Sequence, residues 1–278
     1  MKVLFDKFSW ASSKMATRLY STSFSMGTRM FGKKYRAPIY GIYGFVRFAD
    51  EIVDTFHEYD KPRLLEKYRQ DTYEAIRDGI SLNPILNSFQ HVVNSFGIDP
   101  ELIETFLRSM EMDLGRIRYD RDGFQEYVLG SAEVVGLMCL KVFCGGDEEK
   151  YQALKPSAMR LGAAYQKINF LRDLKADFQG LSRSYFPGVD LNSFSEEAKR
   201  SIESEIDSDF RAGLSGIRQL PRGVLFGVYL SYAYFYALFR KIQNTPAETL
   251  MKKRIRIPDE VKYGILATSY LKYRFGWI

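Results

Sequence analysis

The chain has 278 residues, a length that fits one large domain or two small ones. Its 40 Lys and Arg residues against 34 Asp and Glu residues give a net charge of +6, which suits an anionic ligand or membrane surface without requiring a nucleic acid. Two cysteines and two histidines are too few for a disulfide framework or a zinc site, and they indicate a reducing compartment.

Helical periodicity runs through the chain and alternating strand patterns are nearly absent, which predicts an all-α fold. Proline and glycine mark the breaks, one of them at Arg36-Ala37-Pro38, and Asp99 before Pro100 has the pattern of an N-cap. No linker rich in Gly, Ser or Pro divides the chain, so we expect a single domain over residues 1–278. The predicted helices cover residues 5–30, 37–57, 61–79, 84–96, 99–115, 122–145, 148–178, 195–219, 222–243 and 258–275.

The apolar segments predict a cavity or a wide core, and not a secreted chain. The N-terminal stretch MKVLFDKFSW has no apolar run long enough for a signal peptide because Asp6 interrupts it, so we expect a cytoplasmic protein. The longest uncharged stretch, residues 223–239, is slightly shorter than the ~20 residues of a membrane span. We interpret it as a buried central helix, with a membrane span as the alternative. The 21 Phe and 19 Tyr residues fit a broad apolar interior.

The first acidic motif is RFADEIVD, residues 47–54. On a helix, Asp50 and Asp54 lie one turn apart on the same face, and Arg47 lies three residues before Asp50 on that side. The flanking residues are apolar, so these carboxylates need a cation as a partner. Ordinary salt bridges on a solvated helix face are the alternative interpretation.

The second motif, NFLRDLKAD, occupies residues 169–177. It predicts a stripe of oxygen-bearing side chains along one helix face, and Arg172 directly precedes one of them. Hard cations such as Mg²⁺ bind carboxylate and amide oxygens and share substrate phosphates, so two such helices could hold a diphosphate between them. Two similar motifs 123 residues apart (173 minus 50) favour this interpretation over two unrelated surface patches. The stripe comprises Gln166, Asn169, Asp173 and Asp177.

The two motifs resemble the aspartate-rich motifs of the squalene/phytoene synthase family. Further segments resemble the family in the same order along nearly the whole chain. These segments are YSTSFSMGTRMF (20–31), YGIYGFVRFADEIVD (40–54), MEMDL (110–114), YVLGSAEVVGLM (127–138) and SYFP (184–187).

The resemblance implies an isoprenoid synthase fold, a single helical domain around a central apolar cavity. It implies a prenyltransferase that joins two prenyl diphosphates head to head with Mg²⁺, or Mn²⁺ in its place. The chain looks most like bacterial phytoene synthases of carotenoid biosynthesis, which make phytoene from geranylgeranyl diphosphate through a cyclopropyl diphosphate and without a nicotinamide cofactor. Three alternatives stay open: squalene or dehydrosqualene synthesis from farnesyl diphosphate, a terpene cyclase, and a non-enzymatic helical binding protein.

The resemblance also assigns roles to individual residues. The expected metal-binding residues are Asp50, Asp54, Asn169, Asp173 and Asp177. The expected substrate-binding residues are Ser21, Ser23, Arg47, Gln166, Asn169 and Arg172. Beside the catalytic aspartates Asp50, Asp54, Asp173 and Asp177, the expected residues at the reacting end are Tyr43 and Tyr165.

Some features depart from the family pattern or extend it. Many members have aspartate where this chain has Glu51 and glycine where it has Glu133, so Glu133 must point away from an apolar tunnel or pair with a basic group. A basic cluster of Lys252, Lys253, Arg254 and Arg256 is interpreted as a solvated turn, with docking to an anionic membrane as the alternative. The expected partners are a prenyl diphosphate, the inner face of the membrane and downstream carotenoid enzymes, and no nucleic acid.

Overall fold

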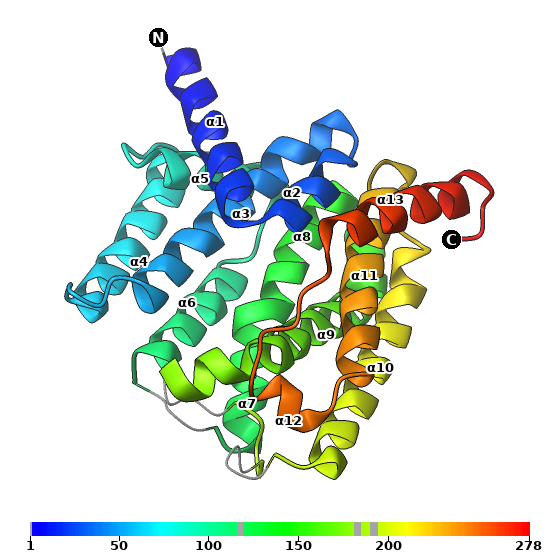
Figure 1. Ribbon diagram of the computed structural model, residues 1–278. Helices are drawn as coiled ribbons and strands as arrows, with labels where there is room; N and C mark the ends of the chain where they lie inside the picture. Colours follow the sequence, from blue (N-terminus) through cyan, green and yellow to red (C-terminus); the bar gives the residue numbers. More distant parts are fainter. Residues whose placement is uncertain (1, 116–118, 181–184, 190–193) are drawn as a thin grey trace.

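Helices account for nearly all the regular structure of the protein, as the sequence predicts (Figure 1). The computed structural model describes residues 2–115, 119–180, 185–189 and 194–278, without the side chains of residues 23 and 176–180. The helices are α1 (Lys2–Tyr20), α2 (Thr22–Arg29), α3 (Lys33–Asp54), α4 (Lys61–Asp78), α5 (Pro84–Phe96), α6 (Pro100–Gly115), α7 (Arg121–Val128), the π-helical turn η1 (Leu129–Glu133), α8 (Val134–Cys144), α9 (Glu148–Gly180), α10 (Glu196–Ile217), α11 (Arg222–Gln243), α12 (Ala247–Leu250) and α13 (Asp259–Arg274).

Two boundaries near the N-terminus differ from prediction. The expected helix 5–30 is two helices, because Ser21 adopts an extended conformation and its hydroxyl caps α2 by accepting from the Phe24 amide at 3.2 Å. The predicted break at Pro38 was wrong, since this proline lies inside α3. Burial of Tyr35 and Pro38 in the core keeps the helix continuous through the proline. The predicted role of Asp99 is confirmed, because its side chain accepts from the Glu101 amide at 2.9 Å.

The core consists of two large apolar clusters that face each other across the molecule. One cluster joins α3, α4, α5, α6 and α8, and at its centre Phe45 stacks on Phe89 with ring centroids 4.0 Å apart. The other joins α7, α9, α10 and α11 around Ile206 and Phe210, which have no exposed surface. Stacked aromatic rings of this kind stabilise a core beyond the burial of their area. Helix α3 is thus packed into the first cluster and α9 into the second.

A π-helical turn interrupts the long helix between α7 and α8. Its Gly130 packs so closely on α6 that a Cβ atom there would lie 2.5 Å from the Ser109 Cβ atom. Single π-turns of this kind often occur at functional sites because they redirect side chains. Within the described residues, the run Arg121–Cys144 is the one helix long and apolar enough to cross a membrane, and half of its apolar window is buried by other helices. Helix α11, which holds residues 223–239, is buried along much of its length, as predicted.

Candidate active site

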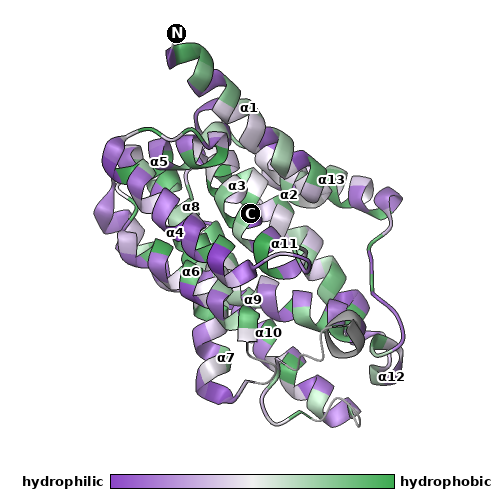
Figure 2. Ribbon diagram, turned by 90° about the vertical axis from the view of Figure 1, so that its left-hand side faces the viewer, coloured by the Kyte–Doolittle hydropathy of each residue, from purple (hydrophilic) through white to green (hydrophobic). Residues whose placement is uncertain are grey.

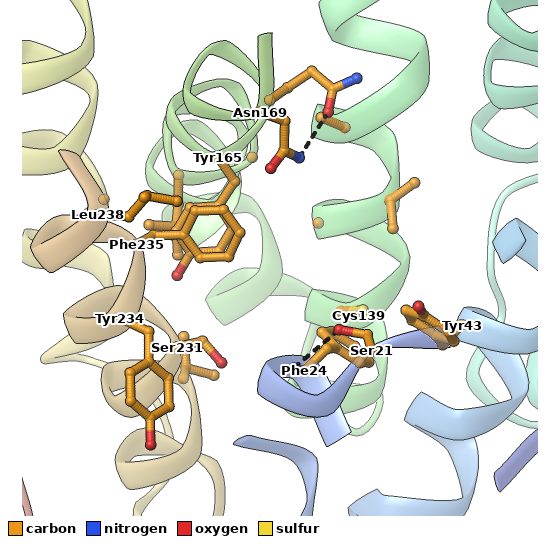
Figure 3. A pocket seen from close by; sticks show the side chains of 18 of the residues that line it. Ser21, Phe24, Tyr43, Cys139, Tyr165, Asn169, Ser231, Tyr234, Phe235 and Leu238 are labelled. Carbon is orange, nitrogen blue, oxygen red and sulfur yellow. Dashed lines mark hydrogen bonds between the residues drawn. The ribbon is translucent and has the colours of Figure 1, made fainter. Parts of the chain in front are cut away.

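A large cavity lies between α3, α8, α9, α10 and α11 and has a volume of about 1090 Å³. This exceeds the ~300–1,000 Å³ of ordinary small-molecule pockets. Its walls are mainly apolar, and the polar residues among them include Arg47 of α3 and, at what we call the polar end of the α9 wall, Asn169 and Arg172. Figure 3 shows side chains from α2 and α3 on one side of the cavity and from α9 and α11 on the other. The arrangement suits a ligand with a charged head and long apolar tails.

Helix α3 supplies the first polar wall. Tyr43 and Arg47 are one turn apart and both line the cavity, and the Arg47 guanidinium lies 4.3 Å from the centre of the Tyr20 ring. Arg47 is hydrogen-bonded to Glu51 and lies 4.0 Å from the Asp50 carboxylate. Arg47 holds the pKa of Glu51 below its ordinary value despite some desolvation. Glu51 thus orients the arginine through their ion pair.

Carboxylates are crowded around Asp50, the next turn of α3. Although Asp50 keeps 32% of its side-chain surface exposed, protein encloses it, and this desolvation together with nearby Asp54 raises its pKa to about 7. Asp113 on α6 adds to the effect and is held by a 2.7 Å hydrogen bond from the Tyr127 hydroxyl. A cation placed here would relieve this repulsion.

Helix α9 supplies the opposite wall through a chain of hydrogen bonds. The Asn169 amide donates to Gln166 at 3.4 Å, a bond drawn at Asn169 in Figure 3. The Gln166 amide in turn donates to Ser131 of η1 at 3.1 Å. One turn further, Arg172 pairs with Asp173 at 2.5 Å. Asp177 lies in the same helix, but its side chain is outside the described part of the structure. The π-turn and α9 thus fix the amide groups that face the cavity.

The C-terminal segment contributes a cation that sequence reasoning did not assign. Arg254 lies 2.6 Å from Asp173 and, together with Arg256, lines the cavity. The basic cluster is solvated as interpreted, since all four of its side chains are exposed, and Arg254 and Arg256 in addition line the cavity. The reason is tertiary, since the segment between α12 and α13 passes over the polar end of α9. Arg172 and Arg254 consequently flank this carboxylate, and Arg256 lines the cavity.

Two tyrosines line the cavity with protonated hydroxyls. Burial raises the pKa of Tyr43 to about 12 and raises that of Tyr165 well above its ordinary range. Tyr165 stacks on Phe235 with ring centroids 4.0 Å apart, and its buried hydroxyl finds no hydrogen-bond partner among the described residues (Figure 3). Cys139 also lines the cavity, and burial raises its pKa to about 12, so its thiol stays protonated.

Glu133 does not line the cavity, which answers the question raised by its place in the sequence. Burial and the nearby carboxylate of Asp209 raise its pKa to about 7, while Lys167 and Arg160 oppose the shift. Those two cations bind Asp209 at 2.9 Å each, from α9 to α10. The first expectation for this glutamate is met, because Glu133 is not part of the cavity wall, while the two cations near it are paired with Asp209.

The predicted site residues fall into three groups. Those that line the cavity are Ser21, Tyr43, Arg47, Tyr165, Gln166, Asn169 and Arg172. Those that lie on the same helices but do not line the cavity are Asp50, Asp54 and Asp173. The side chains of Ser23 and Asp177 are outside the described residues. Sequence reasoning missed Arg254, Arg256 and Asp113, although the MEMDL segment that resembles the family pointed to the last.

The donor set fits Mg²⁺ shared with a ligand better than an all-protein metal cage. No three Asp, Glu, His or Cys side chains within the described ranges are placed to hold a metal ion together. Mg²⁺ commonly takes one or two carboxylates and completes its shell with water and substrate phosphate. Asp50 and Asp54, whose mutual repulsion raises the Asp50 pKa, are suited to such an ion.

Comparison with known proteins identifies relatives over most of the chain. The family model of squalene/phytoene synthase matches residues 17–260. Phytoene synthase of Arthrospira platensis is 26% identical over 213 residues, which are 73% of this chain and 69% of that protein. Phytoene synthase 1 of Solanum lycopersicum is 28% identical over 62% of this chain and 42% of its own length. Presqualene diphosphate synthase of Rhodopseudomonas palustris is 29% identical over 60% and 58%.

Solved structures show the same fold. A dehydrosqualene synthase superposes with a TM-score of 0.81 at 18% identity, covering 96% of this chain and 98% of that one. A squalene synthase from Alicyclobacillus acidocaldarius gives 0.75 at 19% identity, covering 87% and 96%. The match spans less than two thirds of the tomato protein and of the maize phytoene synthase 1, which it covers to 61%. The all-helical fold is therefore the isoprenoid synthase fold, and the chain belongs to the squalene/phytoene synthase family.

Proposed function

We propose that the protein is a prenyltransferase that joins two geranylgeranyl diphosphate molecules head to head to give phytoene. The observation that carries the proposal is that both aspartate-rich helices line the same large, mainly apolar cavity, α3 through Arg47 and α9 through Asn169 and Arg172. Arg47 from α3 and Arg172 from α9 both line the cavity, so a diphosphate bound between them would receive charge-assisted hydrogen bonds from two helices. The apolar walls would receive the prenyl tails.

The reaction requires an active site that stabilises the diphosphate leaving group and that excludes water. Cleavage of the allylic carbon–oxygen bond releases diphosphate, and the arginines at the polar end would bind the charge that develops on its oxygens. Mg²⁺ held by Asp50 and Asp54 would add Lewis-acid stabilisation of the same oxygens. The double bond of the second molecule then forms the new carbon–carbon bond, and loss of a proton closes a cyclopropane ring. A second ionisation, rearrangement and proton loss give the hydrocarbon.

The cavity protects the cationic intermediates. Water would quench an allylic cation, so apolar walls are required. The stacked rings of Tyr165 and Phe235 present aromatic faces that attract a cation without reacting with it. The released diphosphate would accept the proton, because the raised pKa values of Tyr43 and Tyr165 keep both hydroxyls protonated. Phytoene formation requires no external reductant, whereas squalene formation requires a hydride from NADPH.

Cavity volume supports the C20 substrate over the C15 substrate. At interior packing density each hydrocarbon carbon occupies roughly 20–25 Å³. Two C20 tails then need roughly 800–1,000 Å³ and two C15 tails roughly 600–750 Å³. The cavity of about 1090 Å³ accommodates the larger pair with room for the diphosphate end.

Product analysis tests this proposal against its rivals. Purified protein with Mg²⁺ is incubated with geranylgeranyl or farnesyl diphosphate, with and without NADPH, and the extracted hydrocarbons are analysed by mass. We expect a C40 product that does not depend on NADPH. A C30 product without any C40 product would transfer the proposal to squalene or dehydrosqualene synthesis.

A non-enzymatic helical protein is the alternative from another class, and the acidic residues distinguish it. We expect Asp50→Ala and Asp173→Ala each to abolish turnover while the circular dichroism spectrum stays helical. Full turnover in both variants would refute the mechanism. In the cell, we propose that the enzyme works in the cytoplasm at the inner face of the membrane and delivers its product to downstream carotenoid enzymes.

A further inference from the structure

Helix α1 is built the opposite way from an ordinary surface helix. It buries the small residues Ser9, Ser13, Ala16 and Thr17 against its neighbours. Ser9 accepts from the Asn87 amide at 3.0 Å, and Ser13 lies 2.6 Å from the Ser88 hydroxyl of α5. A surface helix normally turns its apolar face to the core and its polar face to water. Here the inner face is held by small polar contacts.

The outer face of α1 carries the large apolar side chains. Leu4, Phe8, Met15 and Leu19 are exposed, with 72% of the surface of Leu4 and 75% of that of Leu19 accessible. Their spacing of four, seven and four residues places them in one stripe, which extends over about 22 Å for fifteen residues. Monomeric proteins seldom expose contiguous apolar patches without an interaction partner. We call these four side chains the α1 stripe.

Basic residues flank this stripe. Lys7, Lys14 and Arg18 are exposed and lie on one side of it, about 40–80° around the helix. Asp6 is the acidic residue of α1, and it is engaged on the inner side with Asn87 at 3.2 Å. The outer surface therefore combines an apolar stripe with positive charge and without a carboxylate.

A second exposed apolar surface lies on α13, beyond the exposed acidic first turn of Asp259 and Glu260. Packing against the rest of the described chain covers little of α13, because Ser269 is the one residue of this helix classed as buried. Tyr263, Tyr270 and Leu271 are exposed, as is Trp277 just beyond the helix, and Lys272 and Arg274 supply positive charge. Tyrosine and tryptophan favour membrane–water interfaces because their rings have an apolar body and a polar tip.

The two surfaces lie at the same end of the molecule and next to the cavity. Helices α1, α2 and α13 lie at the upper end in both ribbon views, and Figure 2 shows green apolar positions along the projecting α1. Tyr20 at the end of α1 and Lys262 in α13 both line the cavity. The apolar surfaces therefore border the approach to the cavity.

We propose that the α1 stripe and the exposed face of α13 dock onto an anionic lipid bilayer. Flanking lysine and arginine complement anionic lipid head groups, and the apolar side chains enter the acyl boundary. A second copy of the chain is a poorer occupant, because symmetric pairing of the α1 stripe would bring Lys7, Lys14 and Arg18 towards their own counterparts. Docking is independent of the substrate, but with the function proposed above it would place the cavity beside the lipid that dissolves the product.

Vesicle flotation with the full chain tests this surface. The protein is mixed with phosphatidylcholine vesicles that contain about 30% phosphatidylglycerol or none, and the floated fraction is measured over a range of lipid concentrations. The first variant, called the stripe variant, replaces three of the four stripe side chains, by Leu4→Ser, Phe8→Ser and Met15→Ser. The second, Lys7→Gln with Lys14→Gln, removes charge. Matched controls are Tyr59→Ser, an exposed aromatic side chain after α3, and Lys67→Gln with Lys155→Gln on α4 and α9.

We expect binding to the anionic vesicles and at least tenfold weaker binding to neutral ones. The stripe variant should lose at least tenfold in partitioning and the charge variant about 25-fold, about fivefold for each lysine. The controls should bind as the unchanged chain does, and circular dichroism should show all variants folded. Failure of the unchanged chain to float with anionic vesicles, or full binding of the stripe variant, would overturn the proposal. So would a dimer, by light scattering, that the stripe variant converts to monomer.

Discussion

The volume argument for substrate choice can be tested at one position in the cavity wall, Ala158. This residue lines the cavity on α9, eleven residues before Asn169, so it lies about 16 Å along the helix axis from the polar end. A prenyl unit advances about 5 Å, from four chain bonds of about 1.5 Å each. Three units of a C15 chain end near 15 Å, whereas the fourth unit of a C20 chain reaches Ala158. We predict that Ala158→Phe selectively excludes the C20 substrate.

The size of the effect follows from the volume removed. Phenylalanine adds six carbons to alanine, which fill roughly 120–150 Å³ at interior packing density, about the volume of one five-carbon prenyl unit. Burying such a unit is worth about 4 kcal/mol at about 0.8 kcal/mol per carbon. Relaxation of the cavity wall around the phenylalanine recovers part of this binding free energy. We therefore expect a net loss of about 2 kcal/mol for the C20 substrate, which lowers its kcat/KM roughly thirtyfold.

The assay is competition between geranylgeranyl and farnesyl diphosphate with Mg²⁺ present, followed by mass analysis of products. For Ala158→Phe the ratio of C20 to C15 use should fall about thirtyfold, while Ala158→Ser, which adds no hydrocarbon bulk, should keep the original ratio. Thermal unfolding of both variants controls for damage to the fold. An unchanged ratio in a folded Ala158→Phe variant would refute the inference that this end of the cavity receives the fourth unit.

Three further predictions concern charge and buried hydroxyls. Because the pKa of Glu133 is raised from 4.5 to about 7 in the folded chain, the folded state holds its proton more tightly and stability falls as pH rises between these values. Urea titrations at pH 5 and at pH 8 measure how far the free energy of unfolding falls between these values, and Glu133→Gln should make that fall smaller by up to about 3 kcal/mol. An unchanged pH dependence in the variant would contradict this prediction. Arg254→Gln removes a cation beside Asp173 and should lower kcat/KM about tenfold. The Tm should change little, since half-exposed ion pairs contribute little to stability. Unchanged kinetics would place Arg254 outside the site. Tyr165→Phe deletes a buried hydroxyl without a described partner, so the free energy of unfolding should stay the same or rise by up to about 1 kcal/mol, and a clear loss in urea titration would reveal a hidden hydrogen bond.

Most of the fold could be predicted because helix signals are local. The spacing of apolar residues and the proline and glycine breaks placed helices such as α5 at Pro84–Phe96, within the predicted 84–96. The errors occurred where tertiary contacts outweigh local signals. Pro38 lies inside α3 because its neighbours are buried, and α12, a four-residue helix, has too few residues for a period to show.

The candidate site was predictable where it follows one helix and not where it joins distant segments. Arg47 and Asp50, or Asn169 and Arg172, share a face through i, i+3 spacing that can be read directly. Arg254 is 81 residues from Asp173 (254 minus 173), and no periodicity links them, so only the folded chain shows the ion pair. The exposed apolar face of α1 could not be predicted either, because apolar periodicity alone does not say which face of a helix is buried.

Binding of inorganic pyrophosphate tests the central claim most directly, that α3 and α9 grip one diphosphate with Mg²⁺ between them. Calorimetric titration would compare the unchanged protein, Asp50→Asn on α3 and Asp173→Asn on α9, each with Mg²⁺ and with EDTA. We predict binding that requires Mg²⁺ and that weakens at least tenfold in either variant. Equal affinity in either folded variant, or binding unaffected by EDTA, would contradict the claim.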